Sequence, residues 1–108
     1  AEDKAERAKK FTSGEPGFGR SACEYFAERK IILTGGDTSA NDAQPVGEIE
    51  GEAVPCHTEL QTRHGIWNIE NLDFEPLLAD GVSEFLFVWA PLKIVGATGS
   101  PGNPVALY

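Results

Sequence analysis

The chain has 108 residues, a mass of 11.6 kDa and a formal net charge of −8. This length fits one domain or part of one, and 41% hydrophobic with 24% charged residues is typical of a globular protein. The 17 acidic side chains outnumber the 9 basic ones, which argues against binding to nucleic acid or to an anionic membrane, because such surfaces attract Lys and Arg.

The N-terminal half predicts a helix followed by a strand. Residues 1–10 are charged and almost lack an apolar stripe, so we expect a solvated lead-in, although their helix propensity is sufficient for a helix. Residues 20–29 space their apolar side chains at helical intervals, and residues 31–34 are apolar and β-branched, which predicts a strand buried on both faces. Residues 41–52 are polar and acidic and predict a surface loop.

The C-terminal half predicts two short helices and three strands. A helix is expected over residues 55–64, begun by Pro55 and ended by Gly65, and a strand begins at residue 66. Asp73 is expected to cap a second short helix. Residues 85–90 predict the strongest strand, continued by 92–95, and a Gly- and Pro-rich loop separates it from a last strand at 105–108.

These elements predict an α/β fold with a mixed sheet and flanking helices. Several strands read as fully buried, which requires covering layers on both faces of the sheet. The predicted helices cover only one face, so we expect missing partner elements, either upstream in the same gene or on another subunit.

The two cysteines and the hydropathy of the sequence indicate in which cellular compartment the chain is expected. Cys23 and Cys56 are expected to be buried thiols in a reducing compartment, and one bridge between them stays open as the alternative. The N-terminus lacks the apolar segment of a signal peptide, and the longest apolar stretch, residues 85–92, is too short to cross a bilayer. A cytoplasmic location is therefore favoured.

The glycine-rich segments do not predict a nucleotide site. GEPGFG has neither the dinucleotide nor the Walker A spacing, and Glu15 would repel a phosphate, so a structural turn is expected. Asp37 follows a predicted strand, which is a common site position in α/β folds, but a role in pinning the turn is favoured.

His57 and Glu70 are the candidate site residues. His57 shares a helical face with Leu60 and His64, and Glu70 is an acid in a segment that is otherwise mostly apolar. A buried carboxylate is costly unless it is paired or binds a metal, and an imidazole and a carboxylate are good ligands for zinc or manganese. Two ligands do not make a site, and a hydrogen-bonded core histidine is the alternative. Cys56 and His57 diverge on a helix and are not expected to form a nucleophilic pair.

Five segments together resemble the cyclase family of metal-dependent hydrolases, which includes bacterial kynurenine formamidase, isatin hydrolase and a trans-dienelactone hydrolase. They are SGEPGFG, ACEYFAER, GGDTS, CHTELQTRHGIWNIENL and EFLFVWAPLKIVGATGSPGNPVAL. The resemblance covers residues 11–108 and corresponds to the C-terminal half of the family's swivelling β/β/α-like domain, so the chain is expected to be a single partial domain with residues 1–10 as its lead-in.

The resemblance implies that His57 and Glu70 are metal ligands for zinc or manganese. The family's HxGTHxD motif, with its remaining ligands and the general acid/base, has no counterpart here, because His57 and His64 are the only histidines. The chain is therefore expected to supply two ligands and no catalytic residue to an enzyme that hydrolyses an amide or a lactone, and to be inactive and to bind metal poorly alone. The alternative is a non-catalytic half-domain that forms a homo-oligomer.

Overall fold

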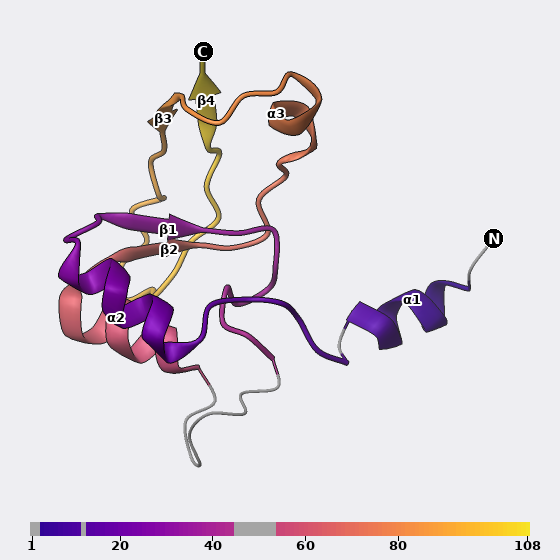
Figure 1. Cartoon of the computed structure of the whole chain (residues 1–108), viewed down its shortest axis with the longest axis horizontal. Helices are drawn as coiled ribbons and strands as arrows, with labels where there is room; N and C mark the ends of the chain where they lie inside the picture. Colours follow the sequence, from indigo (N-terminus) through magenta and orange to yellow (C-terminus); the bar gives the residue numbers. More distant parts are fainter. Residues whose placement is uncertain (1–2, 12, 45–53) are drawn as a thin grey trace. The chain divides into compact units, whose positions relative to one another are not determined.

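The computed structural model describes residues 3–11, 13–44 and 54–108, and these residues form two compact units, residues 1–73 and 74–108. The predicted loop therefore lies outside the described residues from position 45 onwards. The chain combines helices with two small sheets, one parallel and one antiparallel, which confirms the α/β class (Figure 1). None of the helices in these ranges is long and apolar enough to cross a membrane.

The first unit contains two helices and a parallel strand pair, besides the N-terminal helix α1 (Lys4–Phe11). Helix α2 (Arg20–Glu28) lies close to its predicted range. Strand β1 (Leu33–Gly35) pairs in parallel with β2 (Trp67–Ile69), and the π-helix η1 (His57–Arg63) lies in the connection between them. This is the usual way to join parallel strands, because the crossover must return the chain to the same end of the sheet.

Helices α2 and η1 pack against each other below the β1–β2 pair in Figure 1, where η1 is the pink helix. Their contact forms the core, in which the buried side chains are Cys23, Cys56, Leu60 and Ile66. Cys23 and Cys56 form a disulfide, so the expectation of two thiols is wrong. The packing places their Cα atoms 5.5 Å apart, within the range that a disulfide spans.

The expected burial of the first strand on both faces is also wrong. Ile32 is 81% exposed and Trp67, at the start of β2, is 57% exposed, whereas Thr34 is buried. The reason is that, in the described part of the chain, β1 and β2 pair only with each other. A two-stranded parallel sheet cannot bury both of its faces and both of its edges.

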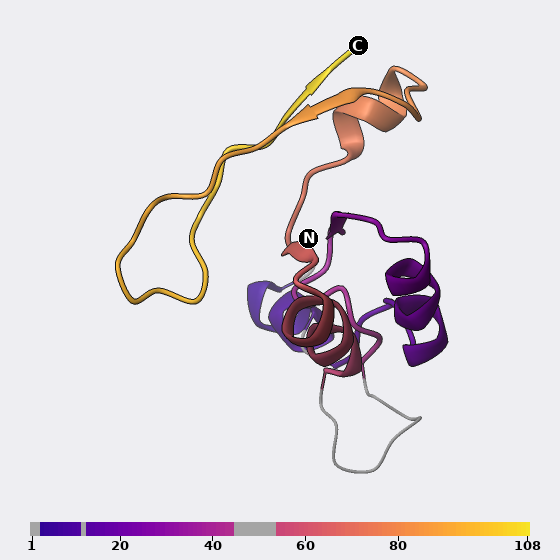
Figure 2. The same cartoon turned by 90° about the vertical axis from the view of Figure 1, so that its left-hand side faces the viewer.

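The second unit contains helix α3 (Glu75–Ala79) and an antiparallel pair of strands, β3 (Leu86–Val88) and β4 (Val105–Leu107). Figure 2 shows the long connection between the two strands as a wide loop. Residues 92–95 lie in this loop, so the predicted continuation of the strand is wrong: Pro91 lacks the N–H that a continuous ladder needs. Phe74, not Asp73, occupies the N-cap of α3.

Candidate functional site

The two predicted site residues come from η1 and from the end of β2. His57 is the first residue of η1, and Glu70 directly follows β2. Glu70 follows the buried Ile69 at the end of β2, and the short connection between η1 and β2 brings Glu70 and His57 to one place.

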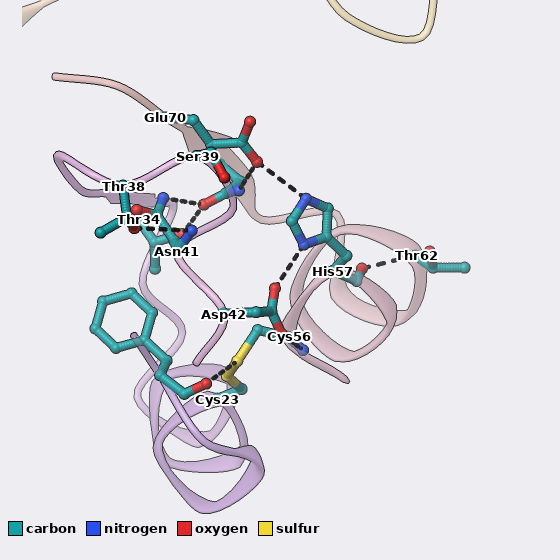
Figure 3. A network of polar contacts seen from close by, with 12 residues as sticks. Cys23, Thr34, Thr38, Ser39, Asn41, Asp42, Cys56, His57, Thr62 and Glu70 are labelled. Atoms are coloured by element: carbon teal, nitrogen blue, oxygen red, sulfur yellow. Dashed lines mark hydrogen bonds and ion pairs between the residues drawn. A yellow bond between two sulfur atoms is a disulfide. The ribbon is translucent and has the colours of Figure 1, made fainter. Parts of the chain in front are cut away.

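His57 and Glu70 are in direct contact. His57 Nε2 lies 3.0 Å from Glu70 Oε1, and the side chains are 30% and 33% exposed respectively. Both groups are therefore half-buried but within reach of solvent. Figure 3 shows the contact between the two side chains. The structure brings the predicted pair together. The metal-binding role itself stays a prediction.

The other nitrogen of His57 meets a carboxylate that the sequence reasoning missed. His57 Nδ1 lies 2.6 Å from Asp42 Oδ2, and the Asp42 side chain is completely buried. The second oxygen of Asp42 accepts a hydrogen bond of 2.6 Å from the Cys56 backbone N–H. One carboxylate therefore holds both the histidine ring and the backbone that carries it.

Asp42 and Asn41 lie in a segment that was expected to be an exposed loop, and that expectation is wrong for both. Asn41 is 3% exposed and Asp42 is fully buried. Isolated bridges from Phe18 to Asp42 and from Glu15 to Gln44 attach this segment to the turn before α2. The segment has no alternation of apolar and polar residues, so its burial leaves no signal in hydropathy.

A chain of amide contacts orients Glu70. Asn68 Oδ1 accepts hydrogen bonds from Thr34 Oγ1 at 3.0 Å and from Asn41 Nδ2 at 2.7 Å. These two donors leave Asn68 Nδ2 to donate to Glu70 Oε1, at 3.0 Å. Asn68 was overlooked from the sequence, although a polar residue between Trp67 and Ile69 is the same kind of signal that identified Glu70.

The remaining candidates lie elsewhere. His64 does not share a face with His57, because the wider π-helical turn changes the phase of η1, and it contacts Glu59 instead, at 3.1 Å. Asp37 is exposed, in contrast to the buried Asp42 five residues later. The GEPGFG turn supplies Glu15, which accepts hydrogen bonds from the N–H and the hydroxyl of Ser39, so it acts as a structural turn.

The donor atoms of His57 and Glu70 fit two neighbouring positions around a metal ion. Metal–ligand bonds of about 2.1 Å at right angles, the octahedral geometry of manganese rather than the tetrahedral geometry of zinc, place two ligand atoms about 3.0 Å apart, which is the separation observed here. The carboxylate on Nδ1 is the usual outer partner of a metal-bound histidine. Within the described ranges, however, no group of three or more His, Cys, Asp or Glu residues could hold a metal, so the pair fits as part of a site.

Comparisons with known proteins identify one curated relative. The chain is 35% identical over 94 residues to isatin hydrolase of Roseibium aggregatum, and the match covers 85% of this chain and 34% of that protein. The chain thus spans about a third of the length of this relative. No family model and no solved structure matches the sequence. The similarity supports a distant relationship between this chain and isatin hydrolase.

Proposed function

We propose that this chain is part of a metal-dependent hydrolase of the cyclase family, corresponds to the C-terminal half of its domain, and supplies the metal ligands His57 and Glu70. The observation that carries the proposal is the 3.0 Å approach of His57 Nε2 to Glu70 Oε1, with Nδ1 on a buried carboxylate. Asp42 holds His57 at the nitrogen that faces away from Glu70, which is typical of a metal-bound histidine, and Asn68 donates to the same Glu70 oxygen that faces His57.

The substrate class follows from the relative. Isatin hydrolase acts by name on isatin, which is a cyclic amide, and the cyclase family hydrolyses amides and lactones. Zinc or manganese bound by His57 and Glu70 would polarise the scissile carbonyl and acidify a water molecule. The described residues around His57 are carboxylates and amides held in hydrogen bonds, so we expect the general base to come from another segment or subunit.

The test compares the chain alone with the chain completed by its upstream coding sequence. An in-frame HxGTHxD segment upstream would supply the remaining ligands and the base. In the completed protein, His57→Ala or Glu70→Ala is expected to abolish bound zinc or manganese and amide hydrolysis, measured by elemental analysis and by substrate turnover. Asp37→Ala, at an exposed aspartate, is the matched control and should retain both.

The 108-residue chain alone is expected to bind metal weakly and to be inactive, because it owns two ligands. Stoichiometric zinc or manganese together with amide hydrolysis by this chain would contradict the proposed division of the site.

The second candidate is a non-catalytic half-domain that self-associates. The observation that favours it is the row of exposed apolar side chains on the β3–β4 pair, namely Leu86, Val88, Val105 and Leu107. A start codon immediately before Ala1 and no metal site in the assembled oligomer would favour this candidate over the hydrolase.

A further inference from the structure

We propose that Asp42 is the positioning residue of this site: its buried carboxylate accepts the Nδ1–H of His57 and so directs Nε2 towards Glu70. This inference rests on the proposed function, because the nitrogen that Asp42 leaves unprotonated is the one assigned to the metal. Nothing in the sequence pattern around Asp42 indicated such a role.

The argument starts from the donors and acceptors at the two ring nitrogens. A neutral imidazole carries a single N–H, whereas the carboxylates on either side, Asp42 at 2.6 Å and Glu70 at 3.0 Å, can only accept. When the ring is neutral, one of the two carboxylates must therefore face a lone pair. The tautomer depends on which of the two carboxylates, Asp42 or Glu70, loses less free energy when it faces an unprotonated ring nitrogen.

Burial decides the choice. The Asp42 side chain has no exposed surface, so without the His57 proton its Oδ2 would lose a hydrogen bond that water cannot replace. Glu70 is one-third exposed and already accepts from Asn68 Nδ2, so water and the amide can compensate it. The proton is therefore expected on Nδ1, the nitrogen with the shorter contact.

Asp42 is itself held at a fixed place relative to η1. Its Oδ1 accepts the N–H of Cys56, whose side chain is bonded to Cys23 on α2. On the other side, the Phe18 N–H donates to Asn41 O and the Ala43 N–H donates to Phe18 O. The carboxylate cannot turn away from His57 without breaking these contacts, so it fixes the ring orientation as well as the tautomer.

The first experiment reads the tautomer directly in the 108-residue chain by NMR of protein with ¹⁵N-labelled histidine, with His64→Gln used to assign the two rings. In the neutral ring of His57 we expect the proton on Nδ1. Asp42→Asn should reverse this, because the amide can still accept the Cys56 N–H only if its NH₂ group then donates to Nδ1. Asp37→Asn makes the same chemical change at an exposed site and should leave the tautomer unchanged.

The second experiment follows the same ¹⁵N signals during titration with Zn²⁺. We expect zinc to shift His57 Nε2, and Asp42→Asn to weaken this binding about 10- to 100-fold, as is usual when the outer partner of a metal-bound histidine is lost. Glu70→Gln should weaken it too without changing the tautomer.

The outcomes separate the two claims. Nε2–H as the neutral tautomer of His57 in the wild type overturns the positioning role, and so does equal zinc affinity in wild type and Asp42→Asn. If the Nδ1–H tautomer is found but zinc fails to shift His57 even in the protein completed by its upstream segment, the proposed function fails and the positioning of the ring by Asp42 stands.

Discussion

Glu59 is a second buried carboxylate among the described residues, and the side chains of Arg63 and His64 compensate it. It is 9% exposed and contacts Arg63 Nη1 at 2.7 Å and His64 Nε2 at 3.1 Å. Burial raises the pKa of Glu59, but the hydrogen bonds from Arg63 and His64 outweigh it and lower the pKa below its usual value. The folded state therefore favours the ionised form of Glu59.

The sign of the resulting pH dependence follows from this direction. Because the pKa of Glu59 is lower in the folded chain than in the unfolded one, its contribution to stability is present above the unfolded value of 4.5 and is lost as the pH falls through the folded value. Glu59→Gln is expected to flatten the acid side of the stability curve, measured by urea unfolding between pH 7 and pH 3. Glu24→Gln, in the more exposed Arg20–Glu24 pair, is the control. Equal acid slopes in the wild type and Glu59→Gln would contradict this role.

Single residues show where sequence reasoning reached the site and where it did not. Glu70 and His57 were predictable because an acid in an apolar segment and a histidine on an apolar face contrast with their neighbours. Asp42 was not, since it lies among polar residues and is buried by contacts with Phe18, far away in sequence. Asn41 adopts φ 58°, a left-handed conformation that asparagine tolerates, and only the folded turn shows that it is required.

At the scale of elements, local patterns predicted the existence of helices and strands better than their pairing. The helix over 55–64 is present, but its central residues form a π-helix, which no periodicity in seven residues reveals. The strand after Gly65 is present as β2, whereas its parallel pairing with β1 depends on the crossover through η1. Burial was overestimated at Ile32, because apolar composition does not show whether a neighbouring strand exists.

The disulfide is the strongest constraint between elements, because it connects α2 to the residue before η1. Cys23 and Cys56 are 33 residues apart, and closing a loop of this length stabilises a fold by about 3–4 kcal/mol through the entropy of the unfolded chain. Reduction, or Cys23→Ser, is therefore expected to lower the free energy of unfolding by about that amount, measured with urea.

The double variant Cys23→Ser with Cys56→Ser serves as the control for this measurement, since a reductant should have no further effect on it. Two reactive thiols in protein purified without reductant, or identical unfolding curves with and without reductant, would contradict the cross-link.

At the scale of the whole molecule, the notable feature is the apolar surface left exposed in each unit. In the first unit this surface includes Ile32 and Trp67, and in the second it is the row on the β3–β4 pair. Exposed apolar side chains beside open strand edges favour association with another chain. We therefore predict that the chain is a partial domain and that another chain covers these surfaces.

The β3–β4 row gives a test of self-association by light scattering at physiological salt. The wild-type chain is expected to be an oligomer. Val88→Glu with Val105→Lys places opposite charges on residues that are direct cross-strand partners, so it should preserve the strand pair while it replaces half of the apolar row with charges. This variant is expected to be a monomer.

Exchanging the charges of two exposed residues of the same unit, with Glu84→Lys and Lys93→Glu, keeps the net charge and the apolar row and should leave the oligomer intact. A monomeric wild-type chain, or an oligomer that survives Val88→Glu with Val105→Lys, would exclude this surface as the interface.

Asp42 contacts both the Cys56 backbone N–H and the His57 ring, and this affects which substitutions the protein can accept. Because Asp42 secures both a backbone amide of the core and the histidine ring, a mutation there disturbs both contacts in a single step. Glu70 is tied only through side chains at a partly exposed position. Substitutions at Glu70 should therefore leave the stability of the fold nearly unchanged, whereas substitutions at Asp42 should lower it.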